Sequence, residues 1–194
     1  MTLSLHRKPL ACLLTDKVCE PQFSPLIIRE LTPRDAEAFH YLRIRSINAD
    51  PTSFSVLLDE EESMSAAQIH SLLDRFYRSS SAALWGGFCA GYLAGMIGLE
   101  PNLGPVRQHS GIVTSLCVLP EYRGQKIAMA LVDHLIAYAR KKPQLESLVL
   151  EVSETAVAAI RLYRKAGFEE SGREPKALAF GDQRFDLIRM HMSV

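Results

Sequence analysis

The sequence has few of the features that mark disulfide frameworks, metal sites or membrane spans. Its 194 residues include four cysteines, which form no CxxC pair. A chain of this length can bury a sizeable core without cross-links, so we expect no disulfide framework. The six histidines form no HxxxH or HExxH pattern, and we assign no metal site. No apolar run approaches the roughly 20 residues that a membrane helix needs.

The sequence also lacks net charge. Its 22 Lys and Arg residues balance 22 Asp and Glu residues, so no overall field attracts nucleic acid or an anionic membrane, and we expect neither as a partner. Near the N-terminus, the apolar patch over residues 10–14 is shorter than the roughly 7–15 residues of a signal-peptide core. We therefore predict a cytoplasmic protein with an N-terminal extension, 1–25, and one domain, 26–194.

Hydrophobic periodicity changes several times along the chain. Thr32 and Pro33 are typical of a helix start, and Asp50 followed by Pro51 is typical of a helix end. The pattern predicts strands over 26–31, 83–89, 92–99, 111–119 and 147–153, helices over 33–49, 65–77, 127–141 and 154–166, and a final hairpin that turns at 180–184. Residues 52–64 are predicted as a polar loop. This order predicts a single α/β (α+β) domain with a mixed sheet.

The turn between the strand at 111–119 and the helix at 127–141 is suited to a phosphate. A helix start offers free backbone N–H groups and the positive end of its dipole. Gly124 permits close approach, and Arg123 and Lys126 add charge. The same residues fit a plain strand–turn–helix connection equally well. Neither GxxxxGK[ST] nor GxGxxG is present, which excludes the two common nucleotide loops.

This turn resembles the cofactor loop of the GCN5-related N-acetyltransferase (GNAT) superfamily, [Q/R]xxGx[G/A]. Arg123 and Ala128 match, and Lys126 stands where the family has Gly. Because Lys adopts a positive φ only at a cost, we expect a helical conformation at Lys126 with an outward side chain. A second block, residues 148–172, is similar to the family's LEVxxxNxxAxxLYxKxGFxxxG. There Ala156 replaces the Asn, which often contacts the coenzyme.

The resemblance implies a GNAT-type domain with a mixed, mostly antiparallel central sheet flanked by helices. It implies acetyl-CoA as cosubstrate and a primary amine as acceptor, carried by a small molecule, a polyamine or a protein N-terminus. It also implies a splayed or bulged strand whose backbone, with the turn, holds the coenzyme: Leu116, Cys117, Val118, Arg123, Gly124, Gln125, Lys126, Ile127, Ala128 and Met129. An added strand or helix at the edge of the sheet could make a homodimer. The alternative function is a GNAT-fold domain that binds CoA or acts without catalysis.

The resemblance also suggests two catalytic residues. Glu151 is the candidate general base, and Tyr163, twelve residues later, is the candidate acid for the departing sulfur. In a strand, Glu151 points away from the face that Leu148, Leu150 and Val152 share. This position fits a solvated surface Glu as well as a catalytic one. Glu100 is the alternative base. No His lies near Cys117 in the sequence to activate its thiol, so we interpret this residue as a small buried apolar one.

The acidic run at residues 60–62 lies between the first two predicted helices, in a region that borders the acceptor site in the family. Such a run could attract a cationic amine. More often it is a solvated helix start, where the helix dipole favours acidic side chains.

Overall fold

The computed structural model describes residues 25–54, 56–102 and 104–194. The predicted N-terminal extension therefore lies outside the described residues, except for Pro25. Apart from short 3-10 turns, the elements are β1 Ile27–Glu30, α1 Ala36–Ala49, α2 Leu58–Glu62, α3 Ala66–Arg78, β2 Ala83–Cys89, β3 Tyr92–Pro101, β4 Ser110–Val118, α4 Ile127–Ala139, β5 Ser147–Ser153, α5 Val157–Ala166, β6 Glu169–Phe180 and β7 Gln183–Ser193. Their order confirms the predicted one, with α2 as an addition inside the predicted polar loop.

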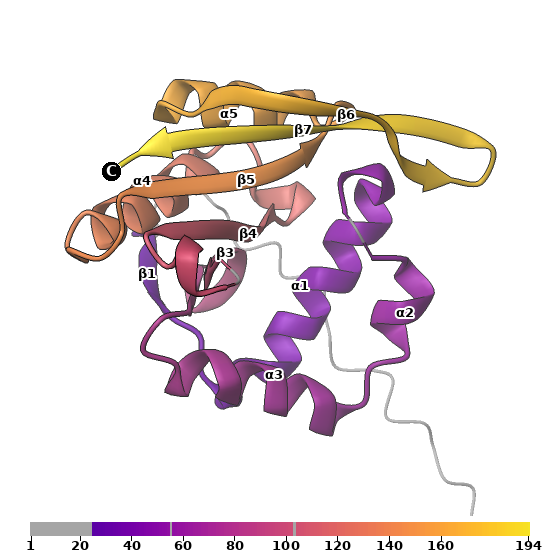
Figure 1. Ribbon diagram of the computed structural model, residues 1–194. Helices are drawn as coiled ribbons and strands as arrows, with labels where there is room; N and C mark the ends of the chain where they lie inside the picture. The colour runs from indigo at the N-terminus through magenta and orange to yellow at the C-terminus, as the bar shows by residue number, and fades with distance from the viewer. Residues whose placement is uncertain (1–24, 55, 103) are drawn as a thin grey trace, which may run out of the picture.

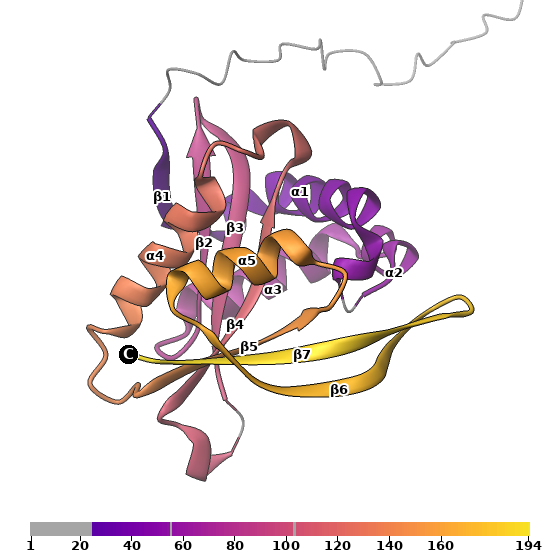
Figure 2. The same cartoon turned by 90° about the horizontal axis from the view of Figure 1, so that it is seen from above.

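The strands form one seven-stranded sheet in the order β1-β2-β3-β4-β5-β7-β6. Neighbouring strands run antiparallel except β4 and β5, which are parallel. The predicted fold class, a mixed and mostly antiparallel sheet flanked by helices, is confirmed. The hairpin of β6 and β7 extends well past the end of β5 (Figures 1 and 2).

Helices cover both faces of the sheet (Figure 2). One hydrophobic cluster lies under α4 and α5 and contains Leu131, Leu135, Ile160 and Tyr163. A second lies under α1 and α3 and contains Leu42, Leu73 and Cys117. In β5, the alternation predicted from the sequence holds: Leu148, Leu150 and Val152 are buried while Glu151 is exposed. The two clusters fix the sheet between its helices.

Candidate active site

A cleft of about 1280 Å³ opens where β4 and β5 separate. These parallel strands pair only over Ser110–Ile112 and Ser147–Val149. Both strands then continue as walls of the cleft, and α1, α5, β7, the end of β3, the turn before α4 and the start of α4 supply further lining. The divergence leaves backbone groups on the open edge of β4 without a β5 partner, so they are available to a ligand.

A bulge in β4 marks the same place. Ser115 has a φ of 59°, and the pairing of β4 with β3 shifts register between Met96 and Gly98. Over this stretch β4 contains one residue more than β3, the geometry of a β-bulge. The bulge predicted from the resemblance near Leu116 is therefore present.

The turn that enters α4 has two residues in the left-handed region. Gly124 has a φ of 78°, and Lys126, the N-cap of α4, has a φ of 64° and ψ of 11°. The predicted helical conformation at Lys126 is therefore wrong: the turn imposes on Lys the backbone that Gly usually supplies, at about 1–2 kcal/mol. No side chain caps this helix start. Its first N–H groups have no intrahelical partners and are suited to an anion.

The two cations of the turn differ in their surroundings. Arg123 lies 2.6 Å (Nη2 to Oδ2) from Asp50 at the end of α1, and its Nε donates to the Val118 carbonyl at 3.2 Å. Asp50 therefore offsets much of the charge that Arg123 offers to a phosphate. Lys126 has no ion-pair partner within the described ranges. Lys126 is thus the cation of this turn that remains available.

Tyr163 reaches the cleft from α5. Only 7% of the residue is exposed, and its ring packs edge-on against Phe168 with the ring centroids 5.7 Å apart. Burial, and secondarily the nearby Cys117 thiol, raise the pKa of the phenol well above its usual range. The phenol therefore stays protonated at any working pH and is able to donate its proton.

Two carboxylates also line the cleft. Glu151 on β5 accepts hydrogen bonds from Arg189 on β7, at 2.6 Å from Nη2 and 3.2 Å from Nε. Glu100, at the end of β3, accepts a 3.3 Å hydrogen bond from the Thr114 hydroxyl. The structure therefore brings both candidate bases and Tyr163 to one cleft.

Comparison with known proteins identifies the family. The profile of the Acetyltransferase (GNAT) family matches residues 41–168, which include the cleft's β4, β5 and α5 walls. The chain belongs to this family. Over 105 residues it is 31% identical to mouse "Probable N-acetyltransferase family 8 member 5", an alignment that covers 52% of this chain and 44% of that relative.

Solved structures share the fold. A GNAT-family acetyltransferase from Streptococcus pneumoniae superposes with a TM-score of 0.79 over 88% of this chain and 100% of that one, at 22% identity. The yncA acetyltransferase of Salmonella typhimurium, solved "with its cofactor Acetyl-CoA", gives a TM-score of 0.76 over 88% and 94% of the two chains, at 15% identity. Acetyl-CoA is the cosubstrate of this family. The uncapped helix start, the left-handed turn and the open edge of β4 fit a pyrophosphate and an extended pantetheine arm.

The predicted cofactor residues gather at the cleft, with one exception. All of them line it except Gln125, whose side-chain amide donates to the Glu121 carbonyl at 3.4 Å. Ala156 also lines the cleft and is the N-cap of α5, where it makes no side-chain cap. The Asn that the family has here would offer both a cap and a ligand contact.

Sequence reasoning missed the contribution of α1. Arg43, Ser46 and Asp50 all line the cleft from this helix. Their spacing of three and four residues places them on one face, which is a signal that the sequence does contain. It was not recognised because nothing in the sequence shows that this face meets β4.

The acidic run at residues 60–62 is only partly solvated. Residues 58–62 form the short helix α2, with Glu60 and Glu62 exposed. Glu61, however, is 3% exposed and holds the Arg43 guanidinium at 2.7 Å (Oε1 to Nε) and 2.6 Å (Oε2 to Nη2). The expectation of a solvated run is wrong for Glu61, which joins α2 to α1.

Fewer observations bear on the location and the assembly of the protein. Within the described ranges, no helix is both long enough and apolar enough to cross a membrane. The cytoplasmic location and the homodimer remain predictions.

Proposed function

We propose that this protein transfers the acetyl group of acetyl-CoA directly to a primary amine within a ternary complex. The acceptor is a small molecule, a polyamine or a protein N-terminus. The observation that carries the proposal is the continuous cleft, which connects the uncapped start of α4 with Tyr163 and Glu151 through the gap between β4 and β5.

The cofactor end would be held mainly by backbone. N–H groups at the start of α4 would hold the diphosphate, and the Lys126 ammonium would add a charge-assisted contact. The free edge of β4 at residues 116–118 would hydrogen-bond the pantetheine amides in the manner of an added strand. Gly124 and Ala128 keep this approach clear of bulky side chains.

At the reacting end of the cleft, side chains of the protein accept and donate protons. When bound, acetyl-CoA supplies an activated acetyl thioester, so the protein's task is to align the amine with it. Glu151 accepts a proton from the acceptor ammonium, which frees the nitrogen lone pair for attack. Tyr163 donates its phenolic proton to the sulfur as the C–S bond breaks. Solvent then restores both groups.

A non-catalytic module is the second candidate. It is favoured by Lys126 and Ala156, which depart from the family pattern at positions next to the coenzyme. The missing Asn contact would weaken cofactor binding, and the strain at Lys126 lowers the stability of the turn that holds the cofactor. The two candidates differ in whether bound acetyl-CoA is consumed.

The first test is thermal unfolding with and without acetyl-CoA. At 100 times Kd, a ligand specific to the folded state adds about 2.7 kcal/mol, which should raise Tm by roughly 5–11 °C for a domain of this size. A thiol-release assay with a panel of amines then measures turnover. No Tm shift at millimolar acetyl-CoA would contradict the proposal, and a shift without turnover would favour the module.

The variant Tyr163→Phe tests the mechanism. It keeps the ring and its contact with Phe168 but removes the proton donor. We expect kcat to fall by about 100-fold, with acetyl-CoA binding nearly intact. Unchanged turnover would show that Tyr163 is only a packing residue.

A further inference from the structure

Ser46 has a buried hydroxyl without a nitrogen or oxygen partner at the wall of the cleft. Only 1% of the residue is exposed, and its Oγ is the one buried side-chain nitrogen or oxygen in the described part of the chain that makes no hydrogen bond. It lines the cleft from α1. Buried polar atoms are nearly always hydrogen-bonded, and an orphan of this kind at a cleft indicates a group that a ligand satisfies.

The neighbours of Ser46 place it at the reacting end. Its hydroxyl contacts the Cys117 thiol, and Cys117 and Tyr163 line the same cleft. A thiol is a weak hydrogen-bonding group and does not satisfy a hydroxyl. The Cys117 side chain belongs to the hydrophobic cluster under α1, whereas the phosphate turn leads into α4 on the other face. Ser46 therefore approaches the cleft from the side opposite α4.

Arg43 precedes Ser46 by one helical turn and lines the same wall. Its Nε and Nη2 donate to the two oxygens of Glu61. The two hydrogens on Nη1 have no partner in the described part of the chain. Because Glu61 fixes the guanidinium, these donors are held in place before any ligand arrives.

We propose that Ser46 and Arg43 form an oxygen-binding subsite that takes the carbonyl or carboxylate oxygen of the acceptor. The acceptor would then be an α-amino acyl compound, in which the reacting primary amine and this oxygen lie on neighbouring carbons. Free amino acids and peptide N-termini share this chemistry. The inference rests on the acetyl transfer proposed above and selects among its acceptor classes.

The charges of the cleft favour this class over a polyamine. Three carboxylates line it, and two are paired with arginine: Asp50 with Arg123 and Glu151 with Arg189. Glu100 has a hydroxyl partner instead. A polyamine brings a second ammonium that requires a further carboxylate, whereas an α-amino acid brings an oxygen that requires donors. Ser46 and Arg43 supply donors.

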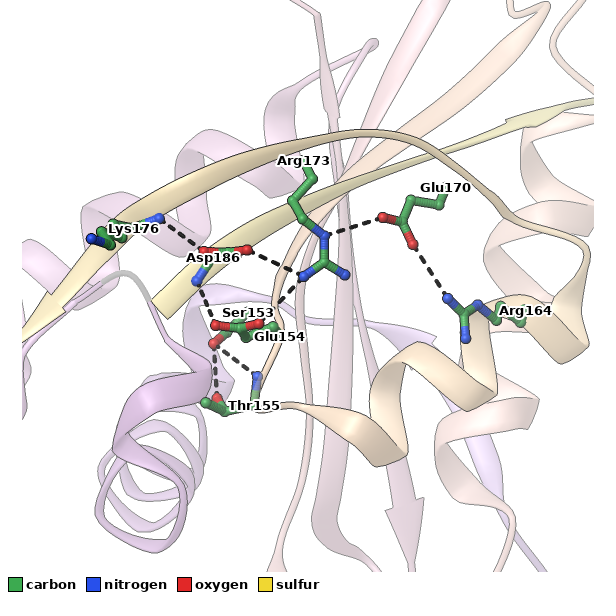
Figure 3. A network of polar contacts seen from close by, with 8 residues as sticks. All are labelled: Ser153, Glu154, Thr155, Arg164, Glu170, Arg173, Lys176 and Asp186. Carbon is green, nitrogen blue, oxygen red and sulfur yellow. Dashed lines mark hydrogen bonds and ion pairs between the residues drawn. The ribbon is translucent and has the colours of Figure 1, made fainter. Parts of the chain in front are cut away.

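The first experiment compares two serines in the protein without cofactor. Ser153 is as buried as Ser46, at 3% exposed, but its hydroxyl is bonded to the Thr155 hydroxyl at 2.8 Å and accepts from the Thr155 N–H at 3.3 Å (Figure 3). Ser153→Ala should lower Tm by roughly 2–4 °C. Ser46→Ala loses only a weak contact with the Cys117 thiol and should lower Tm by less than about 1 °C. An equal loss at Ser46 would mean that its hydroxyl is structural, and would overturn the proposal.

The second experiment measures selectivity with matched acceptors. L-alanine is compared with ethylamine and L-phenylalanine with 2-phenylethylamine, each pair differing only in the carboxylate. L-alaninamide and the dipeptide Ala-Ala separate the free amino acid from the peptide N-terminus. In the wild type we expect the α-amino acyl member of each pair to have the higher kcat/KM. In Ser46→Ala the ratio within each pair should fall about tenfold.

The outcomes separate this inference from the proposed function. If the wild type acetylates amines but Ser46→Ala leaves the ratios unchanged, the subsite is refuted and acetyl transfer stands. A wild-type preference for ethylamine or for spermidine would also refute it. If the wild type releases no thiol from acetyl-CoA with any acceptor, the proposed function and this inference fail together.

Discussion

Glu151 and Arg189 face each other across β5 and β7, and both hydrogen bonds from the guanidinium go to one carboxylate oxygen, Oε1. The other oxygen, Oε2, has no partner in the described ranges. The side chains are 48% and 61% exposed, and surface pairs of this kind contribute little to stability. The pair's consequence is orientation: Arg189 holds Oε1, which leaves Oε2 available to accept a proton.

The first prediction concerns the identity of the general base. Glu151→Gln removes the proton acceptor while keeping the size of the side chain, and should lower kcat by at least about 100-fold with acetyl-CoA affinity retained. Glu100→Gln is the matched control and should cost less than about tenfold. Steady-state kinetics with one amine and a thiol assay measure both. If the Glu100 variant shows the larger loss, Glu100 is the base.

The second prediction separates the charge of Lys126 from its strained backbone. Lys126→Gly relieves the positive φ and should stabilise the cofactor-free protein by up to about 1 kcal/mol, after allowing for the greater chain entropy of Gly. Lys126→Ala keeps the strain and should leave stability nearly unchanged. Both variants lose the ammonium, so both should bind acetyl-CoA several-fold more weakly. Urea unfolding and calorimetry measure the two effects.

A different result would identify the role of Lys126 directly. If both variants bind acetyl-CoA as tightly as the wild type, the ammonium makes no contact with the diphosphate. If Lys126→Gly binds more tightly, the family's Gly is the better residue and Lys126 is a defect of the loop.

The sequence predicts local features of this fold better than contacts between distant residues. The strand alternation around Glu151 and the turn at Gly124 follow from periodicity and from the conformational freedom of Gly, which are properties of short segments. The conformation of Lys126 could not be predicted in this way, because the connection from β4 to α4 imposes a left-handed residue against the preference of Lys. Tertiary context outweighs local propensity there.

The polar pairs of the site also depend on contacts between distant residues, which the sequence does not predict. Glu151 and Arg189 are 38 residues apart in the chain, and Arg43 and Glu61 are 18 apart. Nothing in the spacing of either pair distinguishes it from other opposite charges. The pairing depends on which strands are neighbours and on where α2 docks, and both are set by packing of apolar residues elsewhere. The average behaviour of acidic runs therefore predicts a solvated stretch, although one member of this run, Glu61, is buried.

The third prediction is a pH dependence set by Cys117. Burial raises the pKa of this thiol from 9.0 to about 11. Between these values the unfolded chain has lost the thiol proton while the folded protein keeps it, so stability is fully present below pH 9 and falls as pH rises toward 11. Cys117→Ala should remove this loss, which is on the order of 2 kcal/mol. Urea unfolding at pH 8, 9.5 and 10.5 measures it, and a parallel decline in the variant would assign the loss to other groups.

The fourth prediction tests the ion pair between Arg43 and Glu61. Glu61 is 3% exposed and the Arg43 side chain 15%, so removing the carboxylate leaves a largely buried guanidinium without its charge partner. Breaking a buried pair typically costs about 3–5 kcal/mol, and Glu61→Gln, which keeps one oxygen acceptor, should cost somewhat less, about 2–3 kcal/mol. The matched control is Glu62→Gln, because Glu62 is the exposed neighbour in the same short helix; it should change stability by less than about 0.5 kcal/mol. Urea unfolding at pH 7 measures both variants. Equal stabilities for the two would mean that α2 is held to α1 by its apolar contacts, and that the Arg43 donors facing the cleft are not fixed by Glu61.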